Sequence, residues 1–187
     1  STTKSDIVGG KYVLDKSHAN IFFSVSHLGF SNYFGKFTDF DAILIVNPKR
    51  PKTSNIEVVI NTESADSGNE KLNEKYKSKD FFDVAKFPKA VFKSTELDIK
   101  TDTTAVLTGN LTLLGTTKPV KLDVTFNGTA LNPYAKKNAL GFSAKGKFKR
   151  SDFGMNMYTP SVSDQVNLII EAEFTLDEEL DFSGNKK

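Results

Sequence analysis

Residues 142–149 alternate strictly between two kinds of side chain. Small or apolar residues stand at Phe142, Ala144, Gly146 and Phe148, and the residues between them are a serine and three lysines. Successive side chains of a β-strand point to opposite faces, so this pattern places the apolar set on one face and the lysines on the other. A strand with one dry face and one wet face is typical of an antiparallel sheet.

The side chains in the middle of the apolar face are unusually small. Ala144 and Gly146 lie between two phenylalanines, where a filled core would need larger side chains. This spacing predicts an unfilled space inside a barrel, which an apolar ligand can occupy. The same argument predicts that Gly146→Phe closes this space and leaves the fold intact.

Alternation recurs along the chain and predicts about eight strands joined by turn signals. The segments are 21–27, 35–46, 56–61, 89–99, 107–113, 120–126, 139–150 and 166–174. An all-β fold follows, either an up-and-down barrel or a sandwich. At ~3.3 Å per residue the segment 139–150 spans roughly 33–40 Å, and strands of that length favour a tall, tilted barrel.

One polar segment, 66–82, breaks the alternation and favours a helix. Leu72 and Tyr76 lie one turn apart in it, and polar residues suited to an N-cap stand at its start. A phenylalanine pair, Phe81 and Phe82, ends it. Two interpretations remain: a surface helix that plugs one end of the barrel, or a lid over the opening of a ligand site.

Composition excludes several classes of protein. The formal net charge is only +2, and 23 acidic residues are interleaved with the basic ones, which argues against a nucleic-acid partner. The chain has no cysteine, and therefore no disulfide, thiolate metal site or thiol nucleophile. No apolar run approaches the ~20 residues that a membrane helix needs. Residues 1–10 are polar without a signal-peptide hydrophobic region, so we expect a protein that is either cytoplasmic or already processed.

Neither histidine is expected to be catalytic or to bind a metal. His27 shares the inward face of its strand with Phe23 and Val25, whereas the neighbouring serines point the other way, which disfavours a Ser–His pair. His18 follows Asp15, which is expected to hold its ring. The sequence shows no cluster of further ligands near either histidine. A structural, hydrogen-bonded histidine is the preferred interpretation, with a contact between His27 and a ligand head group as the alternative. Enzyme motifs such as G-x-S-x-G are absent.

Arg150 is expected to point inward, because its position has the same parity as Phe148 near the end of a strand. We expect it to pair with Asp152, since a partly buried arginine needs a partner. The alternative is an anionic head group at the barrel opening, because guanidinium suits carboxylate and phosphate.

Several motif blocks, in order over about residues 11–176, resemble the YceI-like family. The first blocks are Tyr12-Val-Leu-Asp15, His18, Ile21-x-Phe23-x-Val25-x-His27-Leu-Gly29-Phe30-Ser31 and Gly35-x-Phe37. The middle blocks are Asn69-Glu70-Lys71-Leu72, Asp80-Phe-Phe-Asp83, Phe87-Pro88, Phe92 and Gly109-x-Leu111-Thr-Leu113-x-Gly115-x-Thr117-x-Pro119-Val120. The last are Gly141-Phe142, Arg150-Ser-Asp152-Phe153-Gly154 and Ser163-Asp-x-Val166.

The resemblance implies an all-β fold, an extended, lipocalin-like antiparallel eight-stranded β-barrel with one short helical segment at about 66–82. It divides the chain into a flexible N-terminal segment, 1–10, a barrel domain, 11–176, and a polar C-terminal tail, 177–187. It implies a bacterial, periplasmic protein whose secretory signal, absent from this chain, has been removed. The family has no established catalytic activity, so no catalytic residue, cofactor or metal is expected.

The resemblance also implies a ligand. The pore is expected to hold a long polyisoprenoid or another amphipathic lipid, such as a polyprenyl phosphate, a quinone or a fatty-acid derivative, for carriage, storage or stress response. The residues expected to bind it are Phe23, Val25, His27, Phe37, Val58, Ile60, Phe92, Leu111, Phe142, Phe148, Arg150 and the loop residues Phe153, Met155 and Met157. Methionines suit a promiscuous opening because their thioethers adapt to different chains.

Other functions stay open on sequence grounds. One is an enzyme that acts on a bound lipid with His27 as acid or base, and another is a structural or interaction barrel without a ligand. A carrier would also make transient contact with a membrane. Phe22 and the pair Phe81–Phe82 suggest a surface for a second subunit, so a homodimer is a further expectation.

Overall fold

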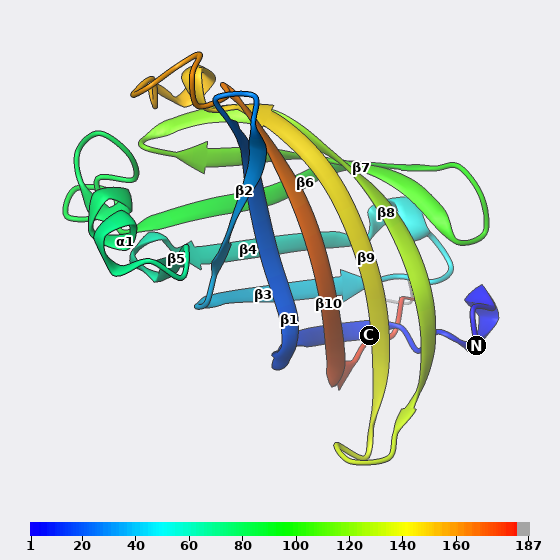
Figure 1. Cartoon of the computed structure of the whole chain (residues 1–187). Coiled ribbons are helices and arrows are strands. Elements are labelled where there is room, and N and C mark those ends of the chain that lie inside the picture. The colour runs from blue at the N-terminus through cyan, green and yellow to red at the C-terminus, as the bar shows by residue number, and fades with distance from the viewer. Residues whose placement is uncertain (183–187) are drawn as a thin grey trace.

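Within residues 1–182, which the computed structural model describes, ten strands form one antiparallel sheet that closes on itself. The strands are β1 (Gly10–His27), β2 (Ser31–Phe37), β3 (Phe40–Val46), β4 (Asn55–Asn61), β5 (Ala65–Asp66), β6 (Lys89–Ile99), β7 (Thr104–Leu113), β8 (Thr116–Asn132), β9 (Lys137–Lys149) and β10 (Gln165–Glu179). The helices are α1 (Glu70–Lys77) and the short 3₁₀ turns η1 (Lys4–Asp6), η2 (Pro51–Thr53), η3 (Thr62–Ser64) and η4 (Arg150–Phe153). Pairing of β1 with β10 closes the barrel (Figure 1).

The ten strands make eight strands of a barrel, as the sequence predicts. β2 pairs with residues 21–27 of β1, and β3 pairs with residues 10–13, both on the side of β1 opposite β10. β5 then pairs with β2, and β4 pairs with β3. β2–β3 and β4–β5 are therefore two long strands, each with one interruption. The uninterrupted strand predicted for 35–46 is wrong at Thr38 and Asp39, where the chain bends sharply (Figure 1).

A bulge in β1 lies near this bend. Leu14 pairs with Phe174 and Ala19 with Ala172, so four residues of β1, 15–18, stand opposite one residue of β10. Extra residues on one strand bend it and increase its twist. The Nζ of Lys16 in the bulge lies 3.2 Å from Oδ1 of Asp39 at the bend, which ties the two irregularities together.

The helix is shorter than the predicted segment 66–82. Its N-cap is Asn69, whose side-chain oxygen accepts a hydrogen bond from the backbone N–H of Leu72 at 3.1 Å. The carboxylate of Asp66 instead accepts a bond from the N–H of Gly68, which has a φ of 78° and turns the chain between β5 and the helix. After α1 the chain folds back, and the whole segment covers one end of the barrel (Figure 1).

Parts of both segments expected to flank the barrel domain, 1–10 and 177–187, contact the sheet. The N–H of Thr129 in β8 donates to the carbonyl of Ser1 at 2.7 Å, so the start of the chain lies against the barrel. β10 continues to Glu179, which pairs with Gly10, so the first part of the tail expected at 177–187 belongs to a strand. Residues 183–187 of that tail lie outside the described residues.

Two glycines make room for aromatic rings inside the barrel. A Cβ on Gly35 would overlap the ring of Phe23 on the neighbouring strand, and one on Gly109 would overlap the ring of Phe92. The outer edge of each ring therefore lies against a strand backbone, a placement that only glycine permits. Among the described residues, no helix has the length and apolar character needed to span a bilayer.

Candidate functional site: the barrel cavity

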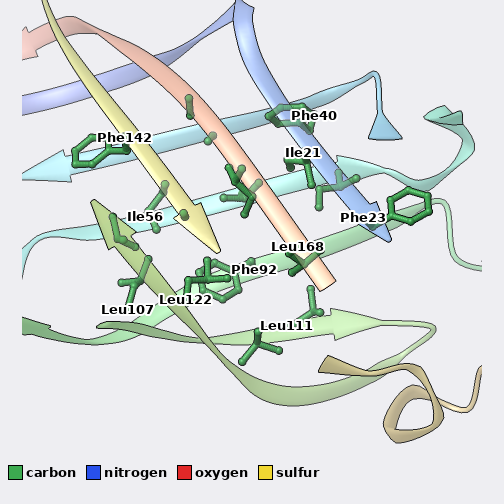
Figure 2. A pocket seen from close by; sticks show the side chains of 18 of the residues that line it. Ile21, Phe23, Phe40, Ile56, Phe92, Leu107, Leu111, Leu122, Phe142 and Leu168 are labelled. Carbon is green, nitrogen blue, oxygen red and sulfur yellow. The ribbon is translucent and has the colours of Figure 1, made fainter. Parts of the chain in front are cut away.

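The barrel encloses a cavity of about 1050 Å³. Every strand except β5 contributes side chains to its lining, and they are mostly aliphatic or aromatic. Figure 2 shows Ile21, Phe92 and Leu168 reaching inward from three different strands. Sites for drug-sized ligands usually measure about 300–1,000 Å³. This barrel cavity is at or above the top of that range, and its apolar lining suits a long hydrocarbon chain.

Aromatic rings line the end of the barrel cavity beneath α1. Phe23 lies 5.2 Å from Phe37 and 5.9 Å from Tyr76 of α1, measured between ring centroids. Phe81 and Phe82 pack against Tyr76 at 6.0 and 6.1 Å. Burial raises the pKa of Tyr76 to about 12, with a smaller contribution from Tyr33, so its phenol stays neutral at physiological pH. All five rings line the cavity, where Phe81 is buried and Phe82 half-buried, and the subunit contact suggested for this pair stays a prediction.

Most of the residues expected to bind a ligand lie in the lining. They are Phe23, Val25, His27, Phe37, Val58, Ile60, Phe92, Leu111, Phe142, Phe148, Arg150 and Met155.

Phe153 and Met157 are not part of the lining. Phe153 is buried and packs perpendicular to the ring of Phe148, with centroids 5.5 Å apart. Met157 packs against the buried core. Both side chains support the wall of the cavity instead of facing its interior.

The space expected at Gly146 is filled by another strand. A Cβ at this position would lie 2.5 Å from Cδ2 of Leu122 and 2.9 Å from the carbonyl oxygen of Lys121, both on β8. The prediction that Gly146→Phe closes the cavity without disturbing the fold is therefore wrong, because the new side chain would collide with β8 backbone. Ala144, the other small residue, does line the cavity.

Arg150 points inward, but its partner is not Asp152. Its side chain is 2 % exposed, and Nε, Nη1 and Nη2 donate to the backbone carbonyls of Ser163, Met155 and Val162 at 2.9, 3.1 and 2.9 Å. Burial lowers the pKa of the guanidinium, and Asp164 partly offsets this. Arg150 therefore holds together the loop that follows β9, and each of its three guanidinium nitrogens already donates to a carbonyl of this loop.

Both ends of the barrel cavity reach the surface, through residues that the sequence did not single out. Beneath α1 the lining includes Lys75 and Tyr158, and Tyr158 is 48 % exposed. At the other end it includes the exposed Lys4 and Lys100. The sequence contained a signal for Lys75, because this residue lies beside the Leu72–Tyr76 pair on the predicted helix. No local sequence pattern marks Tyr158, Lys4 or Lys100 as lining residues.

His27 lies at the α1 end of the lining, exposed, with its backbone in a bridge to Val162. Within residues 1–182 no side chain hydrogen-bonds its ring, so the base-plus-orienting-group arrangement of covalent catalysis is not formed in this part of the chain. The hydrogen-bonded structural role preferred from the sequence does not apply to it either.

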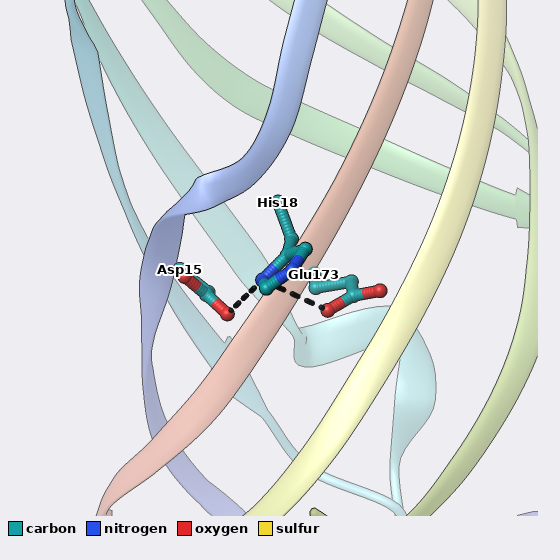
Figure 3. Close-up of side chains that lie close together, drawn as sticks. All are labelled: Asp15, His18 and Glu173. Carbon is teal, nitrogen blue, oxygen red and sulfur yellow. Dashed lines mark hydrogen bonds and ion pairs between the residues drawn. The ribbon is translucent and has the colours of Figure 1, made fainter. Parts of the chain in front are cut away.

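The structure brings a second carboxylate to His18, which sequence reasoning missed. As expected, Asp15 holds the ring, with Oδ2 2.8 Å from Nδ1, and Glu173 of β10 adds a carboxylate oxygen 3.7 Å from the same atom (Figure 3). The β1 bulge is what turns these residues toward one another. All three ligand atoms lie within 4.8 Å, a spacing that a metal ion can bridge, but the direct His–carboxylate contacts already account for the arrangement.

The His18 cluster predicts a pH-dependent contribution to stability. Asp15, then Glu173, raise the pKa of His18 above its usual 6.5, and Ser17, then His18, lower the pKa of Asp15. A raised pKa in the folded state stabilises the fold below the unfolded value, and this contribution disappears as the pH rises through the folded value. The opposed charges coexist only between the two shifted pKa values.

We expect His18→Gln to lower the unfolding midpoint near about pH 6 but not near about pH 9. Thermal unfolding of both proteins across this range, with an NMR titration of His18, measures the effect. A difference between the two midpoints that does not change with pH would contradict it.

The fold and the cavity together define a class of protein, the closed antiparallel barrels that enclose an apolar space large enough for a ligand. Within that class the chain belongs to the YceI-like family: the YceI-like domain matches residues 12–174. Protein YceI of Salmonella arizonae is 39% identical over 173 residues, covering 91% of this chain and 90% of its own length. The resemblance inferred from the sequence motifs is confirmed.

Solved structures share the fold. The Campylobacter jejuni YceI protein is 32% identical, with a TM-score of 0.74 over 88% of this chain and 97% of its own. BcnA of Burkholderia cenocepacia is 22% identical, with a TM-score of 0.77 over 86% and 98%. A polyisoprenoid-binding domain from Saccharophagus degradans is 13% identical, with a TM-score of 0.67 over 91% and 99%. The predicted lipocalin-like barrel is thus confirmed as a fold.

Proposed function

We propose that this protein binds one long apolar lipid, of isoprenoid or fatty type, in the barrel cavity and carries or stores it. The observation that carries the proposal is the cavity itself, about 1050 Å³ with an apolar lining that runs the length of the barrel. The polyisoprenoid-binding domain of Saccharophagus degradans, which has the same fold, supports this class of ligand.

Burial of a hydrocarbon chain is sufficient for tight binding. A chain of ~20 carbons at about 0.8 kcal/mol each gives roughly 16 kcal/mol of gross transfer free energy. Immobilisation of the ligand costs about 4–15 kcal/mol, depending on how that term is estimated. Micromolar or tighter affinity therefore requires no polar contact. The length of the cavity and the residues at its ends then determine which lipid is preferred.

Native mass spectrometry, followed by solvent extraction, tests this function. We expect a co-purifying lipid of defined mass, or stoichiometric uptake of added prenyl or fatty lipid. If the protein neither carries nor takes up a lipid, a structural or protein-interaction role replaces the proposal. Turnover of a bound lipid that His27→Gln abolishes would favour an enzyme instead.

We also propose that the lipid enters from a membrane surface at the β1–β2 turn, in the periplasm. Phe30 at this turn is 86 % exposed, and the N–H of Leu28 donates to the carbonyl of Ser161 at 2.7 Å. The adjacent residues Tyr158 and Val162 line the cavity, so the apolar turn is continuous with its rim. A bilayer is the partner that both accepts exposed aromatic side chains and supplies the cargo.

For this contact, we expect Phe30→Ser to weaken binding to phosphatidylethanolamine–phosphatidylglycerol vesicles about tenfold, by loss of one inserted ring. Tyr134→Ser is the matched control, since Tyr134 is 94 % exposed at the β8–β9 turn and does not line the cavity. Vesicle flotation measures both. Equal losses in the two variants, or no loss in either, would rule out a specific docking turn, and fractionation of cells that express the natural gene tests the compartment.

A further inference from the structure

The two ends of the barrel cavity differ in charge. Beneath α1 the charged residues of the lining are Lys75 and Arg150, and the described lining holds no carboxylate there. At the other end the lining contains Lys4, Lys100 and Asp102. Lys100 is further neutralised by Asp98, whose Oδ2 lies 2.6 Å from its Nζ. Only the α1 end therefore presents cations without an acidic neighbour in the lining.

Of the two cations beneath α1, Lys75 is the one that can meet a ligand. Arg150 donates to three backbone carbonyls and interacts electrostatically with Asp164. The Nζ of Lys75 instead donates to the hydroxyl of Tyr158 and lies 4.3 Å from the centroid of that ring. No carboxylate of residues 1–182 forms an ion pair with it, whereas Lys77 on the same helix pairs with Glu74 at 3.3 Å.

The contact between Lys75 and Tyr158 spans the rim of the cavity. Lys75 belongs to α1 and Tyr158 to the loop that Arg150 holds, and both side chains are part of the lining. An ammonium group has three donors, so Lys75 can keep the phenol oxygen and still donate to a ligand. The phenol O–H supplies a further donor at the same place. A carboxylate or phosphate is the head group that satisfies two such donors and the positive charge together.

We propose that Lys75 and Tyr158 bind the anionic head group of a single-chain lipid whose tail fills the barrel cavity. The site then selects acidic lipids, carboxylate or phosphate, over neutral lipids with the same tail. This inference rests on the proposed lipid-binding function and specifies its ligand class. It assigns the head-group role, which the sequence analysis gave to Arg150 as the alternative to an Asp152 pair, to Lys75, which has no carboxylate partner in residues 1–182.

Matched lipid pairs test the head-group site by isothermal titration calorimetry. Oleate is compared with oleamide, and farnesyl phosphate with farnesol, so that only the head group changes within a pair. We expect the wild-type protein to prefer the acidic member of at least one pair about tenfold, the effect of one charge-assisted contact at a partly exposed rim. In Lys75→Met this preference is expected to disappear, while the affinity for the neutral member changes less than about twofold.

Lys71→Met is the matched control, because Lys71 lies on the same helix, is exposed and does not line the cavity. It is expected to keep the preference. The pair that shows the preference identifies the head group as carboxylate or phosphate. Equal affinity for both members of each pair in the wild-type protein would overturn the head-group site but leave the lipid function standing. Failure of all four lipids to bind would overturn the lipid function itself.

Discussion

Ala144→Phe is expected to lower the affinity for a long-chain lipid about a thousandfold while the protein remains folded. Ala144 is buried in the middle of β9, paired with Val124 and Ile170, and lines the cavity with a single methyl group. A phenyl ring here occupies the place of about five methylenes, worth about 4 kcal/mol at 0.8 kcal/mol each, or a factor of about a thousand. Titration calorimetry measures the affinity.

The fold is expected to tolerate this change because the ring projects into empty space. We expect a loss of stability of no more than about 1–3 kcal/mol, the usual cost of adding bulk to an interior. Lys145→Phe is the control, since the next residue points outward and adds the same ring to the outer face. Unchanged affinity in a folded Ala144→Phe variant would show that the lipid does not pass this point of the cavity.

Arg150→Met is expected to destabilise the protein by about 3–5 kcal/mol, because it leaves three carbonyls of the loop after β9 without their donors. Methionine preserves much of the length and apolar stem of the side chain, so the loss of hydrogen bonds dominates. Urea unfolding measures it as a lower midpoint with an unchanged slope. A change in the slope would instead mean that the compactness of one of the two states had changed.

Arg50→Met serves as the control for this substitution. Arg50 is exposed before η2, and substitutions at such positions usually change stability by less than about 0.5 kcal/mol. If Arg150→Met costs no more than Arg50→Met, the buried guanidinium is not what holds the loop.

The fold was predictable from the sequence to the level of strands and their faces. Phe142, Ala144 and Phe148 face the interior as their alternation indicates, and the helix lies where the pattern breaks. The break of the strand at Thr38 was not predictable, because it lies beside a bulge in β1, and β1 is a separate segment of the chain.

The candidate site was predictable in its apolar part only. Twelve of the fourteen expected residues line the cavity, and for the apolar residues on strands inward parity was sufficient to place them there. The polar contacts were missed. Arg150 has carbonyl partners 5 to 13 residues away, and Lys75 meets Tyr158 across 83 residues.

The sequence by itself determined which face of each strand is apolar, because side-chain direction in an extended chain is a local property of the backbone. Only the tertiary structure decided which residues meet across strands. Leu122 fills the space beside Gly146 because the register pairs β8 with β9. Glu173 lies beside His18 because closure of the barrel pairs β1 with β10. The head-group site proposed at Lys75 likewise arises where a helix and a distant loop meet at one end of the barrel, and no local pattern specifies such a meeting.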